Sequence, residues 1–139
     1  MMARLSTSKK KEQKSMMEII RRLRIRTFKK RFIYSKRNPY RKLVFEWDGA
    51  GISKEGKIVL IEAELKNIDE WHIQNHLAKV AVMVGRGTPI VKLVWIVYRE
   101  HFRLLRHYVD SWLTFFLPVI KVQFPDIEYR TPKGDLIVD

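Results

Sequence analysis

The sequence predicts an α/β fold, in which a mixed central β-sheet is flanked by helices. With 139 residues, the chain is long enough for one domain with a hydrophobic core and too short for two. Its hydrophobic periodicity divides it into segments in the order α-β-β-β-α-β-α-β. Three strands in succession favour an antiparallel meander, and the later β-α-β segment favours a parallel crossover.

The N-terminal part is predicted to contain a tail, a helix and a short strand. Residues 1–10 are expected to form a disordered basic tail, which leaves residues 11–139 as a single domain. A helix is expected from about Lys11 to Thr27, because its apolar residues recur on one helical face. The stretch KRFIYS, residues 30–35, follows as a strand, and Pro39 marks a loop.

The next two strands form a predicted hairpin. The first runs from Leu43 to about Ala50, the turn is SKEGK, and the second is KIVLIEAELK, which ends at Lys66. Gly56 suits the left-handed position of a three-residue loop, and such a loop pairs Ser53 with Lys57. A two-residue loop would instead turn the side chains of one strand to the opposite face.

The C-terminal half is predicted to contain two helices and two strands. Asn67 and Glu70 resemble a capping box at the start of a helix over residues 67–87. A second helix is expected to end before Pro118, because proline interrupts helical hydrogen bonding. The remaining expected elements are a strand at residues 90–98, the second helix at residues 99–116 and a last strand at residues 119–124.

Charged side chains gather at the far end of the predicted hairpin. The three-residue loop places Asp48 opposite Glu62 and Glu46 opposite Glu64, and Lys66 follows on the same side. Carboxylates this close repel one another and destabilise paired strands. A divalent cation relieves that repulsion, and Mg²⁺ prefers oxygen ligands of this kind. The cluster therefore predicts a metal site, with a metal-free surface patch as the alternative.

Asp48, followed in the next strand by Glu64-Leu65-Lys66, resembles the signature of the PD-(D/E)XK nuclease superfamily, which includes Holliday junction resolvases and repair nucleases. The resemblance covers roughly residues 31–98. It implies a restriction-endonuclease-like α-β-β-β-α-β core and the hydrolysis of DNA phosphodiester bonds. It also implies that Asp48 and Glu64 bind Mg²⁺ or Mn²⁺, that the Leu65 carbonyl can add a ligand, and that Lys66 assists the attacking water.

A second reading of the motif remains open. Glu62 and Glu64 form a competing Glu-x-Glu frame, in which both bind the metal and Lys66 lies outside the site. Trp47 stands where the superfamily carries its proline. The weaker candidates to support the metal ligands are Glu18 in the first helix and Gln74 in the helix after the motif.

Two histidines follow the motif on the next predicted helix. His72 and His76 are four residues apart, a spacing that can bind zinc. Position 73 is Ile rather than the Glu of a metalloprotease, and no third ligand is evident from the sequence. Both histidines are expected on an exposed flank of the helix, away from its core face. A contact with DNA phosphate is the better functional alternative.

The basic charge is concentrated in one segment. Residues 1–42 contain sixteen lysines and arginines but two acidic residues, whereas residues 43–139 are nearly neutral. This distribution predicts a polyanionic partner, and aromatic residues among the charges favour DNA. The expected phosphate contacts are Arg21, Arg22, Arg24, Lys29, Lys30, Arg31, Lys36 and Arg37, with His72 and His76.

Together these features predict a Mg²⁺-dependent DNA endonuclease of the resolvase or repair type, without a membrane partner. A homodimer is expected from the resemblance alone, since two cuts need two active sites. The absence of cysteine favours a reducing, cytoplasmic setting. Two alternatives remain open. One is a non-catalytic nucleic-acid-binding protein that uses the basic segment, and the other is a peripheral membrane or partner-binding domain anchored by the first helix.

Overall fold

The computed structural model describes residues 7–25, 27–37 and 42–138, with side chains at 10–11, 14–25 and 47–138. Within these ranges the elements follow the predicted order α-β-β-β-α-β-α-β. They are α1 (Thr7–Arg22), β1 (Thr27–Arg37), β2 (Lys42–Ile52), β3 (Ile58–Glu64), α2 (Glu70–Gly85), β4 (Ile90–Val97), α3 (Arg99–Ile120) and β5 (Asp126–Arg130).

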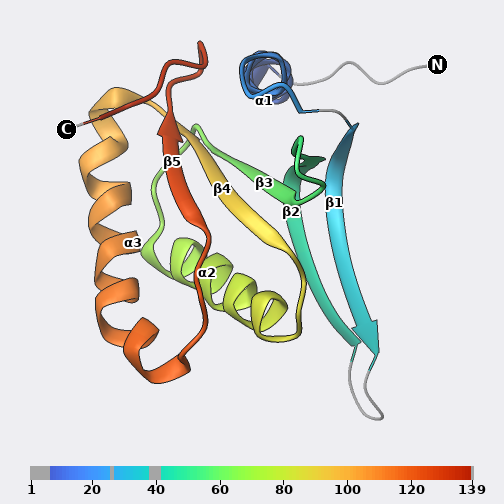
Figure 1. Ribbon diagram of the computed structural model, residues 1–139. Helices are drawn as coiled ribbons and strands as arrows, with labels where there is room; N and C mark the ends of the chain where they lie inside the picture. Colours follow the sequence, from blue (N-terminus) through green and yellow to red (C-terminus); the bar gives the residue numbers. More distant parts are fainter. Residues whose placement is uncertain (1–6, 26, 38–41, 139) are drawn as a thin grey trace.

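The strands form one mixed sheet whose spatial order, β1-β2-β3-β4-β5, equals their order in the chain. β1, β2 and β3 pair antiparallel, as strands joined by short turns do. β3, β4 and β5 pair parallel, because α2 and α3 return the chain to the same end of the sheet. The predicted fold class, a mixed central sheet flanked by helices, is therefore confirmed (Figure 1).

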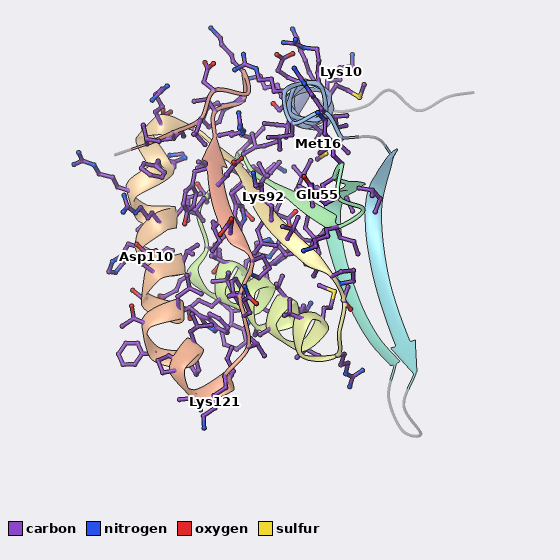
Figure 2. All side chains as sticks on the ribbon, viewed as in Figure 1. Lys10, Met16, Glu55, Lys92, Asp110 and Lys121 are labelled. Atoms are coloured by element: carbon purple, nitrogen blue, oxygen red, sulfur yellow. The ribbon has the colours of Figure 1, made fainter. Side chains whose placement is uncertain are left out.

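Alternating side chains of β3 build two cores, one on each face of the sheet. On one face, Val59 and Ile61 pack with Met16 and Ile19 of α1, and Met16 lies on the side of α1 that faces the sheet (Figure 2). On the other face, Leu60 packs with residues of α2 and α3. α1 therefore covers one face of the sheet, and α2 and α3 cover the other.

The boundaries of the N-terminal elements differ from the expectation. α1 begins at Thr7 rather than at about Lys11, so residues 7–10 of the expected disordered tail are helical. Residues 1–6 lie outside the described chain. β1 and β2 are longer than predicted, since they pair in one register from Thr27–Ile52 to Arg37–Lys42. Cross-strand pairing thus overrides the weak strand propensity of the lysines and glycines in these segments.

The end of the chain also differs from the expectation. α3 runs through Pro118 to Ile120, and the last strand lies at 126–130 rather than at 119–124. Pro118 falls in the final turn of α3, where it removes a single backbone donor. The earlier turns are held on the sheet by the buried side chains Phe102, Leu105, Val109 and Trp112.

α3 buries Phe102, Leu105, Val109 and Trp112, and Asp110 lies on its outer side (Figure 2). Charged residues interrupt the first half of the helix, whereas its second half exposes Phe115, Phe116 and Val119. None of the described helices combines the length and the apolar character needed to cross a membrane.

The C-terminal segment folds back onto α1. Gly134, in the turn after β5, has a φ of +93°. A Cβ atom added at Gly134 would lie 2.8 Å from Cγ of Glu18, so the turn closely approaches the helix. Arg22 Nη1 also donates to Asp135 Oδ1 at 2.9 Å. These contacts connect α1 to the opposite end of the chain.

Candidate metal centre

The hairpin of β2 and β3 has the predicted turn. The Ser53 amide donates to the Lys57 carbonyl at 2.8 Å, and Gly56 has a φ of +77°. The three-residue loop over residues 54–56 and the register that follows from it are therefore confirmed. This register brings Asp48 opposite Glu62 without a shift.

The sheet opens between β2 and β3 at the end of this hairpin. Their ladder stops at the pair Gly49–Ile61. Beyond that pair, β2 continues beside β1 and β3 continues beside β4 as far as Glu64. Figure 1 shows β1 and β2 curving away from β3. The expected backbone pairing of Asp48 with Glu62 is thus replaced by a split that side chains fill.

Asp48 bridges the split with its side chain. Its Oδ2 accepts a hydrogen bond from the Ala63 amide at 2.9 Å. This bond satisfies a backbone donor of β3 that no longer faces a ladder partner on β2. It also holds the Asp48 carboxylate next to Glu62, the residue that precedes Ala63.

Glu62 lies inside the split and is 5% exposed. Its carboxyl group is hydrogen-bonded to Asp48, and its Oε2 contacts Nε2 of His76 on α2. Burial is the main reason that the pKa of Glu62 lies well above its ordinary value, and the carboxyl groups of Asp48 and Glu64 raise it further. Without a cation, the site therefore favours the protonated, neutral form of Glu62.

His76 presents one ring nitrogen to Glu62. Burial, as the largest cause, lowers the pKa of His76 to about 4, so its ring is neutral at pH 7. Its Nδ1 lies 3.0 Å from the His72 carbonyl. A carbonyl oxygen only accepts, so Nδ1 carries the ring proton and Nε2 directs its lone pair toward Glu62. A neutral imidazole in this orientation is a metal ligand by chemistry and geometry.

His72 and Glu64 complete the cluster on its solvent side. His72 Nε2 lies 3.2 Å from Glu64 Oε1, and the His72 side chain is 48% exposed. One ligand atom each from Glu62, His72 and His76 lie within 4.8 Å of one another. These three residues are close enough to hold a metal ion, with the carboxylates of Asp48 and Glu64 beside them.

Two tryptophans close the buried side of the cluster. The ring of Trp47 packs edge-on against His76 at a centroid distance of 4.9 Å. Trp95, the ladder partner of Glu62 on β4, lies 6.0 Å from Trp47. Both indoles are buried, so they keep water from this side of Glu62 and His76. From the sequence, Trp47 stands only as a departure from a motif, and its packing role comes from the fold.

The structure brings together three of the predicted carboxylates, Asp48, Glu62 and Glu64. It does not continue the strand to Lys66. Because β3 ends at Glu64, Lys66 lies two residues beyond the strand and is exposed, rather than on a continuous charged strand face. Leu65 packs with the α1-side core, and Gln74 is half-buried on α2. The side chain of Glu46 lies outside the described side chains.

The expected exposure of the two histidines is right for His72 and wrong for His76, which is 7% exposed. No third ligand is evident from the sequence, whereas Glu62 fills that place in the structure. One signal was present in the sequence. His76 directly precedes Leu77 and lies three residues after Ile73, and both of these residues face the core. His76 therefore borders the buried face of α2.

The predicted phosphate contacts on α1 are exposed, but part of their charge is already paired. Arg21 and Arg22 both contact Glu18, and Arg22 also pairs with Asp135. Arg24 is exposed just after the helix, with a φ of +53°. The other predicted contacts, Lys29, Lys30, Arg31, Lys36 and Arg37, lie on β1 outside the described side chains.

α1 and the carboxylate cluster lie on opposite faces of the sheet. α1 packs on Val59 and Ile61, whereas Glu62 faces α2. Glu18, a predicted support for the metal ligands, therefore belongs to the α1 face, where its two arginine partners lower its pKa to about 2. The structure gives Glu18 a role in the contact between α1 and the C-terminal segment.

The fold and site thus define a mixed α/β domain with a candidate metal centre at a split in its sheet. A comparison with protein families finds no match, and a comparison with curated proteins finds none either. The crystal structure of protein VC1899 from Vibrio cholerae is similar, with a TM-score of 0.49 and 16% sequence identity. The match covers 85% of this chain and 27% of that one, so this chain spans about a quarter of its length.

Proposed function

We propose that this protein is a metal-dependent DNA endonuclease that hydrolyses phosphodiester bonds at the split between β2 and β3. One observation carries the proposal: Asp48, Glu62 and Glu64 converge where the ladder of the two strands ends. Carboxylates converging in this way are suited to hold Mg²⁺ or Mn²⁺. The resemblance of Asp48 and Glu64-Leu65-Lys66 to the PD-(D/E)XK signature supplies the reaction class.

Each residue of the proposed site has its own role. A divalent cation bound there supplies positive charge for the reacting phosphate and lowers the pKa of a bound water. Asp48, Glu62 and Glu64 are the residues that would hold the cation. The hydrogen bond from Ala63 keeps the Asp48 carboxylate in place before substrate arrives. Lys66, exposed beyond β3, neutralises phosphate charge near the site.

We place Glu62 inside the metal site and thereby favour the Glu-x-Glu frame over one that begins at Glu64. The support is the contact of Glu62 with both Asp48 and His76, since it puts this carboxyl at the centre of the cluster. The end of β3 at Glu64 leaves the position of Lys66 less constrained. In this frame, Lys66 lies outside the metal site, and its contribution is limited to attracting phosphate.

The proposed partner is DNA, bound through the basic N-terminal segment. Residues 1–42 carry the excess positive charge, and phosphate contacts of this kind give affinity without sequence specificity. A homodimer with two active sites and a cytoplasmic setting complete the proposal. β1, which carries five of the predicted contacts, pairs with β2 and so runs beside the strand of Asp48.

The direct test is cleavage of branched, duplex and single-stranded DNA with Mg²⁺, with Mn²⁺ and with EDTA. We expect cleavage of at least one substrate with metal and none with EDTA. Glu62→Gln is expected to abolish cleavage, whereas Glu55→Gln, the same change in the exposed hairpin turn, is a matched control that retains it. Lys66→Ala separates the frames, because it should abolish cleavage if Lys66 assists the attacking water and should leave most cleavage intact if Lys66 lies outside the site.

A second candidate function is DNA binding without cleavage. The separation of α1 and the carboxylates onto opposite faces of the sheet favours it, because DNA held by α1 alone need not reach the split. Salt-sensitive DNA binding by the wild type, with every substrate intact in Mg²⁺ and Mn²⁺, would establish this function and reject the endonuclease.

A further inference from the structure

We infer that the centre between β3 and α2 is selective for a divalent transition-metal ion, of the Mn²⁺, Co²⁺ and Zn²⁺ class, over Mg²⁺. Its protein ligands are the imidazoles of His72 and His76 together with the carboxylate of Glu62. This inference deepens the proposed function, since it concerns the same split in the sheet. It adds two imidazoles to the carboxylates of the proposed function, which makes the site one of mixed nitrogen and oxygen ligands.

The first support is the geometry of the three ligands. Their nearest ligand atoms lie within 4.8 Å of one another. Ligand atoms around a tetrahedral zinc ion lie about 3.3 Å apart, given metal–ligand bonds of about 2.0–2.1 Å. Metal binding would bring exposed His72 inward by a small rotation and would separate Glu62 Oε2 from His76 Nε2, which are now in direct contact. Residues four apart on one helical face, such as His72 and His76, suit a shared metal.

The second support is the hydrogen bond behind His76. Its Nδ1 donates to the His72 carbonyl, at 3.0 Å, and thereby aims Nε2 at Glu62. A metal-ligating histidine almost always donates its second ring nitrogen to a carbonyl or carboxylate in this way. The bond orients the ring and keeps Nε2 free of a proton. The same α2 turn therefore supplies both a ligand and the group that orients it.

The third support is the chemistry of the ligand set. Imidazole nitrogen suits zinc, cobalt and related ions, whereas Mg²⁺ demands oxygen ligands in an octahedron and keeps several of its waters. Glu62 and His76 are buried, and Trp47 covers the ring of His76. Burial on this side favours an ion that exchanges its waters for protein ligands over Mg²⁺, which keeps several of its waters.

Metal titration of the intact chain tests the inference. After removal of bound metal with EDTA, Co²⁺, Zn²⁺, Mn²⁺ and Mg²⁺ are titrated separately by calorimetry, and the visible spectrum of bound Co²⁺ reports nitrogen ligation. We expect one Co²⁺ or Zn²⁺ ion per chain, bound at least about tenfold more tightly than Mg²⁺. Equal affinities for Co²⁺ and Mg²⁺ overturn the inference.

Three variants locate the site. His76→Gln and His72→Ala are each expected to weaken Co²⁺ binding by about 10- to 100-fold while changing Mg²⁺ binding little. His107→Ala, which removes an exposed histidine on α3, is the control and should match the wild type. His72 is half exposed, so its variant remains informative if the His76 variant folds poorly. Wild-type Co²⁺ binding in folded His72→Ala overturns the inference.

Cleavage is measured beside binding, so that the two proposals fail separately. Tight Co²⁺ binding that depends on His72 and His76, with no cleavage of any DNA, retains the metal assignment and rejects the endonuclease. Efficient Mg²⁺-dependent cleavage that is unchanged in the His72 and His76 variants retains the endonuclease and rejects the metal assignment.

Discussion

Two glutamates on opposite sides of the sheet show how the surroundings decide whether a carboxyl group beside a basic side chain is ionised. Glu18 of α1 contacts Arg21 and Arg22 at the surface, and these arginines lower its pKa to about 2. Glu62 of β3 contacts His76 in the split, and burial raises its pKa well above the ordinary value. The first pair is charged at neutral pH, whereas the metal-free second pair favours its neutral form.

The difference separates a structural contact from a candidate reactive centre. Water and fixed positive charge stabilise the Glu18 carboxylate, so it serves to hold α1 near the C-terminal turn. Glu62 lacks such a cation, and its site is completed by two imidazoles and further carboxylates. A metal ion would supply the charge that the buried carboxyl lacks.

The largest effect is expected from removing the charge of Glu62 with Glu62→Gln. Binding of Co²⁺ and DNA cleavage should both fall by about 100-fold or more, because a neutral amide is a poor metal ligand. In EDTA at neutral pH, stability should change by only about 1 kcal/mol, since the wild-type carboxyl is already neutral there. Metal titration and urea unfolding measure the two quantities, and a collapse of stability in EDTA would contradict the neutral form.

The second prediction concerns the pH dependence of stability in the metal-free protein. The ordinary pKa values of glutamate and histidine are 4.5 and 6.5, whereas in the fold the pKa of Glu62 is raised and that of His76 is lowered to about 4. Between pH 4.5 and 6.5, the unfolded pair and the folded pair each hold one proton. The proton is on His76 in the unfolded chain and on Glu62 in the folded protein. Because both states hold the same number of protons, this pair does not change the free energy of unfolding with pH in this range.

Above pH 6.5 the unfolded histidine loses its proton, and for as long as the raised pKa of Glu62 keeps the folded carboxyl protonated, stability falls as pH rises. The expected slope is about 1 kcal/mol per pH unit until folded Glu62 ionises. In Glu62→Gln, stability should instead rise to about pH 6.5 and then level off, because only His76 titrates. The charged groups around the pair are Asp48, Glu64, His72 and Lys79. Urea unfolding in EDTA from pH 5 to pH 9 measures stability against pH for the wild type and for Glu62→Gln. Identical curves for the two proteins would show that the proton is not on Glu62.

A smaller effect is expected at the contact between α1 and the C-terminal turn. Gly134→Ala should destabilise the protein by about 2 kcal/mol, because φ is positive there and the new Cβ meets Glu18. Gly56→Ala is the matched control, with a similar φ of +77° but nothing within 4 Å of the added atom. It should cost about 1 kcal/mol. Equal losses would show that the approach of the turn to α1 contributes nothing.

The smallest effect is expected from Glu18→Gln. The pKa of Glu18 is lowered in the fold, so its carboxylate stabilises the protein above the unfolded pKa, and this contribution disappears as pH falls toward 2. The variant should therefore have a slightly lower Tm than the wild type at pH 7 and the same Tm near pH 2. Since these side chains are exposed, added salt should also reduce the difference at pH 7. A difference that persists at pH 2 would point to packing instead of charge.

Local sequence signals predicted much of the hairpin and of the candidate site. Gly56 favours a left-handed turn residue, and that turn sets the register that brings Asp48 opposite Glu62. Strand alternation then places Glu62 and Glu64 on one face. The capping of α2 differs from the prediction. The N-cap is Asp69 rather than Asn67, and its side chain accepts a hydrogen bond from the Trp71 amide. Such features depend on residues close together in the chain, and they are readable without a structure.

Other features depend on contacts between distant segments. The burial of His76 requires Trp47 of β2 to pack on its ring, and no local pattern reports that contact. The placement of α1 on the face opposite Glu62 depends on its apolar side meeting Val59 and Ile61. α3 passes Pro118 because its preceding turns are anchored on the sheet. In each case long-range packing outweighs or supplements a local preference.

By itself, therefore, the sequence determined the order of the elements, the hairpin register and the meeting of three carboxylates. The tertiary structure decided that the strands part beside them, that Glu62 is buried, and that two histidines of α2 complete the cluster. The physical reason is the range of the forces involved. Turn geometry and alternation act over a few residues, whereas burial and ligand convergence exist once separate elements have packed together.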